Sequence, residues 1–157
     1  MILNHYTKVI WGLLRMDEKR VLSMLDQLDR YYKELQETIP RDFKNFQETI
    51  IKRSNERITQ LLIEICIDIS NLLFKELKLG LPEEEENVFE ILAKNKVISK
   101  SMSNKLKRMK RFRNILIHRY GQIDDRLVYE NINKNKKDFI AFKKEILEFV
   151  KEQKFNK

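Results

Sequence analysis

The residues best suited to chemistry stand close together in the segment Arg113-Asn-Ile-Leu-Ile-His118-Arg-Tyr120. Histidine changes its charge near neutral pH, so His118 can take or give the proton of a ribose hydroxyl as a general base or acid. Arginine presents a rigid fork of donors that can hold a phosphate and its developing charge. This pattern therefore predicts RNA cleavage without a metal ion, with Arg113 and His118 as the catalytic residues.

Positive charge is concentrated on the same part of the chain. The stretch from Lys100 to Tyr120 holds eight of the 32 basic residues and no acid, and the other 24 basic residues equal the 24 acids of the chain. The net charge of +8 is therefore local, and such a field favours an anionic partner such as a nucleic-acid backbone. An ordinary solvated helix would interleave Glu with its Lys and Arg residues. We expect RNA phosphates to be bound by Lys105, Arg108, Lys110, Arg111 and Arg119.

Helical geometry constrains the catalytic pair. Five positions along an ideal helix turn a side chain by about 140°, so a straight helix would not bring Arg113 and His118 together. Asn114, four positions before His118, is nearly aligned with it and is expected to support it. Either the helix loosens near Tyr120, as Gly121 permits, or a second copy of the chain completes the site across a two-fold axis.

The elements that position this segment are expected to be helices. Three glycines and two prolines in 157 residues are too few for the tight turns of a sheet protein, which predicts an all-α up-and-down bundle of about five helices. The length fits one domain over residues 1–157. Residues 1–15 have weaker periodicity and are expected to be peripheral, and residues 151–157 to form a frayed tail.

Apolar periodicity predicts the first two helices. One starts at Met16-Asp17-Glu18 and ends before Pro40, because proline disfavours helical backbone in the residue before it. The second is a long spine helix that runs from Phe43 to Leu77. Gly80 is expected to take the left-handed conformation that ends this helix.

The remaining helices are predicted from their caps. Pro82 starts a third helix with acids in its first turn, which stabilise the positive end of the helix dipole. Ser99 is expected to cap the basic helix, and Gly121 to end it. Asp124 caps a last helical region with a kink near 133–135.

A polar stripe accompanies the apolar face of the spine helix. Its helical spacing admits two interpretations, an ordinary solvated face or a set of groups that orient the catalytic residues. If the spine and basic helices lie side by side, Glu64 or Asp68 can orient Arg113 or His118. The stripe consists of Arg57, Gln60, Glu64, Asp68 and Asn71.

Composition excludes several classes of protein. The single Cys66 cannot form an internal disulfide and lies in an apolar run, so we expect a buried thiol and a cytoplasmic protein. No apolar stretch approaches the ~20 residues that span a bilayer. Two histidines, one cysteine and no glycine-rich loop predict neither a metal site nor an organic cofactor.

These residues resemble a known family, the HepT-like toxins of the HEPN superfamily. The resemblance rests on the segment Arg113 to Tyr120, followed by Ile123-Asp124-Asp125 and by Val128-Tyr129. The segment from Asn55 to Ile69 resembles the long central helix of the family, and Phe89 to Ala93 also matches. The resemblance therefore extends over most of the chain.

The resemblance implies a fold, an activity and a partner. It implies an all-α bundle that forms a homodimer, in which Arg113 and His118 of both copies line a ribonuclease cleft. It also implies a type VII-like toxin–antitoxin pair, whose MNT-type nucleotidyltransferase antitoxin attaches AMP to Tyr120. A bulky anion near the helical face of Arg113 would occupy the phosphate site of that cation and exclude RNA by repulsion.

Two functions from different classes remain open from the residues alone. The first is the metal-independent endoribonuclease toxin. The second is a non-catalytic helical module that binds RNA or docks an acidic protein. The first predicts RNA cleavage with EDTA present, whereas the second predicts salt-sensitive binding without cleavage.

Overall fold

The computed structural model describes residues 17–81, 85–118 and 123–155, and all regular structure in these residues is helical. The expected all-α class is therefore confirmed. The helices are α2 (Glu18–Thr38), α3 (Phe43–Phe46), α4 (Thr49–Glu76), α5 (Glu85–Lys94), α6 (Lys100–Ile117), α7 (Asp125–Asn135) and α8 (Lys137–Phe155).

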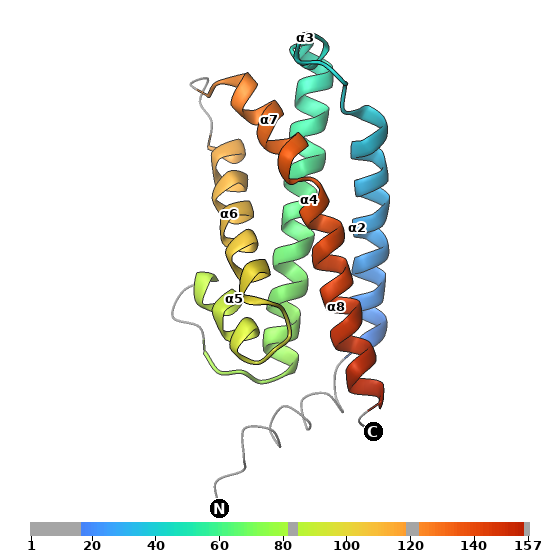
Figure 1. The fold of residues 1–157 in the computed structure, drawn as a ribbon, viewed down its shortest axis with the longest axis vertical. Coiled ribbons are helices and arrows are strands. Elements are labelled where there is room, and N and C mark those ends of the chain that lie inside the picture. Colours follow the sequence, from blue (N-terminus) through green and yellow to red (C-terminus); the bar gives the residue numbers. More distant parts are fainter. Residues whose placement is uncertain (1–16, 82–84, 119–122, 156–157) are drawn as a thin grey trace, which may run out of the picture.

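Helix α4 is the central element of the bundle (Figure 1). It contacts α2, α5, α6 and α8, and α5 also packs against α6. The long helices α2, α4, α6 and α8 run along the long axis of the molecule, with α3 and α7 near one end (Figure 1). This arrangement places the basic helix α6 directly beside α4.

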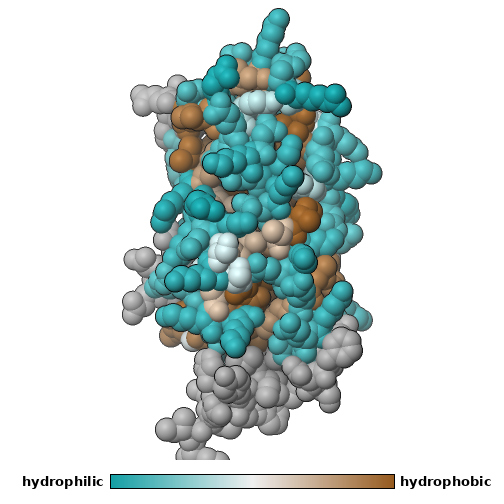
Figure 2. All heavy atoms as spheres, in the orientation of Figure 1, coloured by the Kyte–Doolittle hydropathy of each residue, from teal (hydrophilic) through white to brown (hydrophobic). Residues whose placement is uncertain are grey.

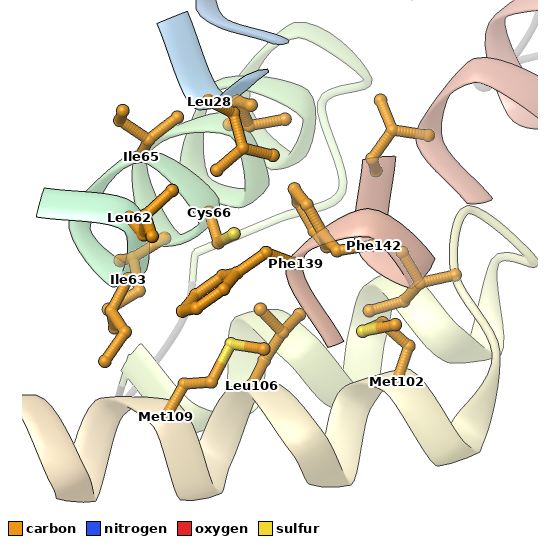
Figure 3. Packing of buried hydrophobic residues seen from close by; sticks show 14 of the residues in the cluster. Leu28, Leu62, Ile63, Ile65, Cys66, Met102, Leu106, Met109, Phe139 and Phe142 are labelled. Atoms are coloured by element: carbon orange, nitrogen blue, oxygen red, sulfur yellow. The ribbon is translucent and has the colours of Figure 1, made fainter. Parts of the chain in front are cut away.

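The core lies where four helices meet. Figure 3 shows Leu28 from α2, Cys66 from α4, Leu106 from α6 and Phe142 from α8 converging on one apolar interior. All four side chains have an exposed fraction of 0%. The expectation of a buried Cys66 is confirmed, and burial raises the pKa of its thiol because the thiolate loses its hydration.

Side-chain caps start three of the helices at the predicted places. Asp17 accepts a hydrogen bond from the Arg20 N–H at 3.1 Å at the start of α2. Ser99 Oγ accepts from the Met102 N–H at 3.0 Å before α6, and Asp124 caps α7. Each bond satisfies a backbone donor that has no partner within its own helix.

The single spine helix predicted from Phe43 to Leu77 is wrong at its N-terminal end. The chain breaks at Glu48, where ψ is 128°, so that α3 and α4 are separate helices. The break turns Phe43 and Phe46 toward Tyr129 of α7, with ring centroids 5.8 and 5.1 Å apart. Ile50, which the periodicity assigned to the buried face, is 76% exposed.

The spine helix also ends differently from the prediction. Lys78, not Gly80, takes the left-handed position directly after α4, with φ of 52°. The Leu79 N–H donates to the Phe74 carbonyl at 3.3 Å, which closes the turn. Gly80 does have a positive φ of 118°, but it lies two residues further along the loop. The expected kink of the last helical region is present as the break between α7 and α8 at Lys136.

Candidate active site and nucleic-acid interface

The packing of α6 on α4 brings Arg113 to Glu64. The Nε atom of Arg113 lies 3.7 Å from Glu64 Oε1, and the two side chains are 27% and 30% exposed. Gln60 Nε2 donates to the same Glu64 oxygen at 3.0 Å. One of the two acids proposed to orient the catalytic residues therefore lies beside Arg113, and a neighbour on its own helix holds it there.

The contact between the Nε atom of Arg113 and Glu64 is an ion pair without a hydrogen bond. A separation of 3.7 Å is too long for a hydrogen bond. The Nε atom is buried and has no hydrogen-bond partner among the described residues. Because a buried donor without an acceptor is costly, a small movement that brings a carboxylate or phosphate oxygen closer to Arg113 would be favourable.

Asp68 adds a second carboxylate to this pair. Burial first, and then the charge of Glu64, raises the pKa of Asp68, whereas the positive charge of Arg113 lowers it. The positive charge of Arg113 therefore acts on two acids, Glu64 and Asp68, that lie one helical turn apart on α4. We call Glu64, Asp68 and Arg113 the seam cluster, because they lie along the seam between α4 and α6.

His118 lies in a different environment at the end of the same helix. It is the C-cap of α6, exposed to solvent, with φ of −93° and ψ of 17°, and its N–H donates to the Asn114 carbonyl at 3.0 Å. The helix therefore ends at Ile117, before the predicted Gly121, because the backbone of His118 leaves the helical conformation. Asn114 is also exposed.

Regular helical geometry up to Ile117 keeps the two predicted catalytic side chains apart within one chain. Arg113 faces α4, and an ideal helix carries the side chain five positions later about 140° around the axis. Loosening of the helix does not occur before His118. The predicted modification site Tyr120 and the predicted RNA-binding residue Arg119 lie outside the described residues, as does Gly121.

The predicted RNA-binding cations differ in how they are engaged. Lys105 forms an ion pair with Asp138 of α8 at 2.8 Å, and both side chains are largely covered. Arg108 and Arg111 are exposed and Lys110 is half-buried. Hydrophilic side chains cover most of the face shown in Figure 2, with small apolar patches between them. Among the predicted RNA-binding cations that the structure describes, Arg108 and Arg111 are therefore the exposed ones.

Sequence reasoning missed how Gln60 is used. For the polar stripe that includes Gln60, both a solvated face and a positioning role were open. Its spacing of four residues from Glu64 predicts the side-chain hydrogen bond that the structure shows. The ion pair of Lys105 with Asp138 gave no local signal, because these residues meet only through the packing of α6 on α8.

Neither a metal-binding cluster nor a membrane span is found in the part of the chain that the structure describes. No group of three or more His, Cys, Asp or Glu side chains in these residues could hold a metal ion. Among the described helices, none combines the length and the apolar composition that crossing a bilayer requires.

The fold is that of an all-α protein of the HEPN type. The sequence model of the ribonuclease HepT-like family matches residues 28–146, and the chain belongs to that family. The mRNA nuclease HepT of Shewanella oneidensis is 27% identical over 122 residues, which cover 78% of this chain and 92% of that protein. The family resemblance seen in the sequence is thereby confirmed.

Solved structures share the fold. The tri-AMPylated HEPN toxin of Shewanella oneidensis in complex with MNT antitoxin is similar with a TM-score of 0.73 and 27% identity, over 80% of this chain and 95% of that one. The cytosolic protein YutE of Bacillus subtilis, of unknown function, has a TM-score of 0.74 at 20% identity, over 88% and 94% of the two chains. The second likeness concerns the fold alone.

Proposed function

We propose that the protein is a metal-independent endoribonuclease toxin that acts in the cytoplasm and is neutralised by a nucleotidyltransferase antitoxin. The observation that carries the proposal is an arginine held at the seam of two helices by Glu64, five positions before an exposed histidine at a helix end. Membership of the ribonuclease HepT-like family supports the same activity.

The proposed reaction is a transfer of the phosphoryl group within the RNA strand. The ribose 2′-oxygen attacks the adjacent phosphorus and loses its proton, the bond to the 5′-oxygen breaks, and that oxygen gains a proton. His118 moves one of these protons, and Arg113 binds a non-bridging phosphate oxygen where negative charge develops. The products are a 2′,3′-cyclic phosphate and a 5′-hydroxyl. Asn114 supports His118, and Glu64 with Asp68 positions Arg113.

A homodimer is part of the proposal because one chain directs the two groups to different sides of α6. An isologous interface would face Arg113 of one copy with His118 of the other. Ile115 and Ile117, in the last turn of the helix, are 48% and 42% exposed. Apolar side chains beside a polar site are suited to such an interface.

RNA would lie along the basic helix, and the antitoxin would neutralise the toxin at the end of that helix. Arg108, Lys110 and Arg111 supply phosphate contacts without base specificity, with Arg119 further along. Lys105 contributes less, because Asp138 already pairs with it. A relative has been solved as a tri-AMPylated toxin with an MNT antitoxin, which supports Tyr120 as the residue that receives AMP here.

The decisive experiment is cleavage of a fluorophore-quencher RNA by wild-type and His118→Ala protein, with EDTA present. We expect the substitution to reduce cleavage at least about a hundredfold, the usual contribution of a general acid or base. Folding should be unchanged by circular dichroism, because the His118 side chain is exposed. Asn104→Ala, at another exposed position of α6, is the matched control and should cleave normally.

Two outcomes would reject this assignment. Full cleavage by His118→Ala protein would remove the histidine from the mechanism. Wild-type protein that binds RNA in a steeply salt-dependent manner but never cleaves it would instead favour a non-catalytic RNA-binding module.

A further inference from the structure

A second feature of α6 lies on the other side of the α4–α6 seam. A cavity of about 70 Å³ is enclosed by α4, α6 and the junction of α7 with α8. Ile63 and Phe112 line it, whereas their sequence neighbours Glu64 and Arg113 belong to the seam cluster. The cavity and the proposed active site are therefore adjacent but open on different sides of the helix pair.

The interior of the cavity is apolar and partly aromatic. Its walls include Ile63, Met109, Phe112, Ile132 and Phe139. Figure 3 shows the ring of Phe139 between Ile63 of α4 and Met109 of α6. Flat aromatic and thioether groups of this kind are suited to contact with the face or edge of a planar ring.

The rim of the cavity is positively charged. Lys105, Arg108 and Lys136 line it, against the single carboxylate of Asp138. The carboxylate of Asp138 lies 2.8 Å from Lys105 Nζ and pairs with it. Lys136 Nζ donates to Asn133 Oδ1 at 3.1 Å. Because Asn133 is neutral, this hydrogen bond does not compensate the positive charge of Lys136. Arg108 is exposed and pairs with no carboxylate among the described residues. The ligand that fits is an anion with a planar apolar part.

We propose that this cavity is a subsite for one nucleotide of single-stranded RNA. Arg108 and Lys136 bind the phosphate, and the edge of the base enters between Phe112 and Phe139. An engineered apolar cavity of about 150 Å³ binds one benzene molecule, and the cavity of about 70 Å³ is half that size, so it takes only part of a base. The subsite therefore anchors the strand by stacking and charge rather than by reading the whole base.

The inference rests on the proposed ribonuclease function and adds a path for the strand. Arg108 lies on α6 between the cavity and the exposed side of the helix, where Arg111 also lies. A strand anchored in the cavity would cross the outer side of α6 toward His118. An acidic protein segment is the competing occupant, but it would leave the aromatic walls of the cavity without a matching planar group.

The test is RNA binding in a His118→Ala background, so that cleavage does not interfere. A fluorescein-labelled 20-nucleotide single-stranded RNA is titrated by fluorescence anisotropy at several salt concentrations. We expect Arg108→Ala with Lys136→Ala to weaken binding about tenfold or more and to lower the salt slope by about 1.4, which is about 0.7 for each cation removed from a phosphate of a single strand. Arg108→Ala alone, which leaves the α7–α8 junction intact, should lower the slope by about 0.7.

The matched control replaces two exposed cations outside the cavity, Lys19 of α2 and Lys44 of α3, with alanine. If the cavity and control variants bind RNA equally well, the subsite is wrong. Unchanged RNA binding together with lost binding of a partner protein would show that the rim docks an acidic protein, which also overturns the proposal. If the cavity variants lose RNA binding and the wild-type protein, with His118 intact, never cleaves RNA, the ribonuclease function is refuted but the subsite is retained.

Photocrosslinking tests the placement of the base separately. RNA that contains 4-thiouridine should crosslink to the peptide that includes Met109 and Phe112. Phe112→Leu, which keeps an apolar wall without the ring, should reduce this crosslink while leaving the salt slope unchanged. Crosslinks confined to other peptides would contradict insertion of the base.

Discussion

The two ends of the catalytic motif differ in how much the fold restrains them. Arg113 is largely covered, faces two carboxylates on α4 and keeps a buried donor without an acceptor among the described residues. His118, five positions later, is exposed at the C-cap of the same helix. A phosphate-binding cation benefits from a fixed direction, whereas a proton-transfer group benefits from contact with water and substrate. One helix supplies both environments because its inner side packs and its end does not.

The same contrast separates the seam ion pair from the surface ion pairs. Arg30 and Asp26 on α2 lie 3.3 Å apart, but both are about 70% exposed. Solvent screening leaves such pairs with little effect on stability or position. The pair of Arg113 with Glu64 is longer, at 3.7 Å, but it is largely covered and joins two helices. Its position in the fold, rather than its length, makes it a candidate for a functional role.

The largest expected effect comes from mixing two inactive variants. Arg113→Gln and His118→Ala should each abolish RNA cleavage alone. If Arg113 of one copy works with His118 of the other, mixed dimers regain one intact site of two. Because half of the dimers are mixed after random exchange, activity should return to about a quarter of the wild-type value. Cleavage rates before and after subunit exchange measure this.

The control for mixing is Arg113→Gln protein exchanged with itself, which should remain inactive. A mixture that stays inactive, although mass spectrometry shows mixed dimers, would mean that both residues act within one chain. In that case, residues beyond His118 would have to bring Arg113 and His118 of the same chain together.

A smaller effect is expected from Glu64→Gln, which keeps the shape of the side chain and removes its charge. Arg113 should lose its orientation, and cleavage should fall about tenfold while the fold is retained. The pKa of Asp68 should fall as well, because the charge of Glu64 is one of the causes that raise it. NMR titration of the Asp68 carboxyl and single-turnover cleavage assays measure the two effects.

Glu34→Gln, at an exposed position of α2, is the matched control and should change neither quantity. A fall in cleavage without a fall in the pKa of Asp68 would show that Glu64 acts through packing alone. An unchanged cleavage rate would remove Glu64 from the positioning of Arg113.

The smallest effect is expected from Asp68→Asn, and its sign follows from the raised pKa of Asp68. A folded-state pKa above the unfolded value of about 3.8 means that the native protein binds the proton more tightly. This contribution to stability is fully present below the unfolded pKa and is lost as the pH rises through the folded pKa. The free energy of unfolding, measured in urea between pH 3.5 and 7, should therefore fall less with pH in Asp68→Asn protein than in wild type.

At neutral pH the Asp68→Asn variant should be at least as stable as wild type, within the roughly 0.5 kcal/mol usual for surface substitutions. Asn71→Asp, at an exposed position of the same stripe, adds an acid instead of removing one and should shift the pH dependence in the opposite direction. An Asp68→Asn protein whose stability falls with pH as steeply as that of wild type, or more steeply, would contradict the raised pKa of Asp68.

Patterns between near neighbours allowed much of the fold to be predicted. The caps at Asp17, Ser99 and Asp124 each depend on a side chain and an N–H two or three residues away, so the sequence alone could predict them. The break at Glu48 could not be predicted from local spacing. It accompanies the packing of α3 against Tyr129 of α7, a residue far along the chain. Periodicity alone favours one uninterrupted helix there.

For the candidate site too, some features follow from the sequence and others depend on the tertiary structure. The motif residues, the basic run and the polar stripe are properties of residue type and spacing, and the amino-acid sequence by itself determined them. Only the tertiary structure decided that Arg113 meets Glu64, that Asp138 engages Lys105, and that Arg108 stays exposed beside a cavity. Helical periodicity determines which side chains share a face, but the partners of that face depend on how distant helices pack, and Coulomb energies depend on the resulting distances and burial.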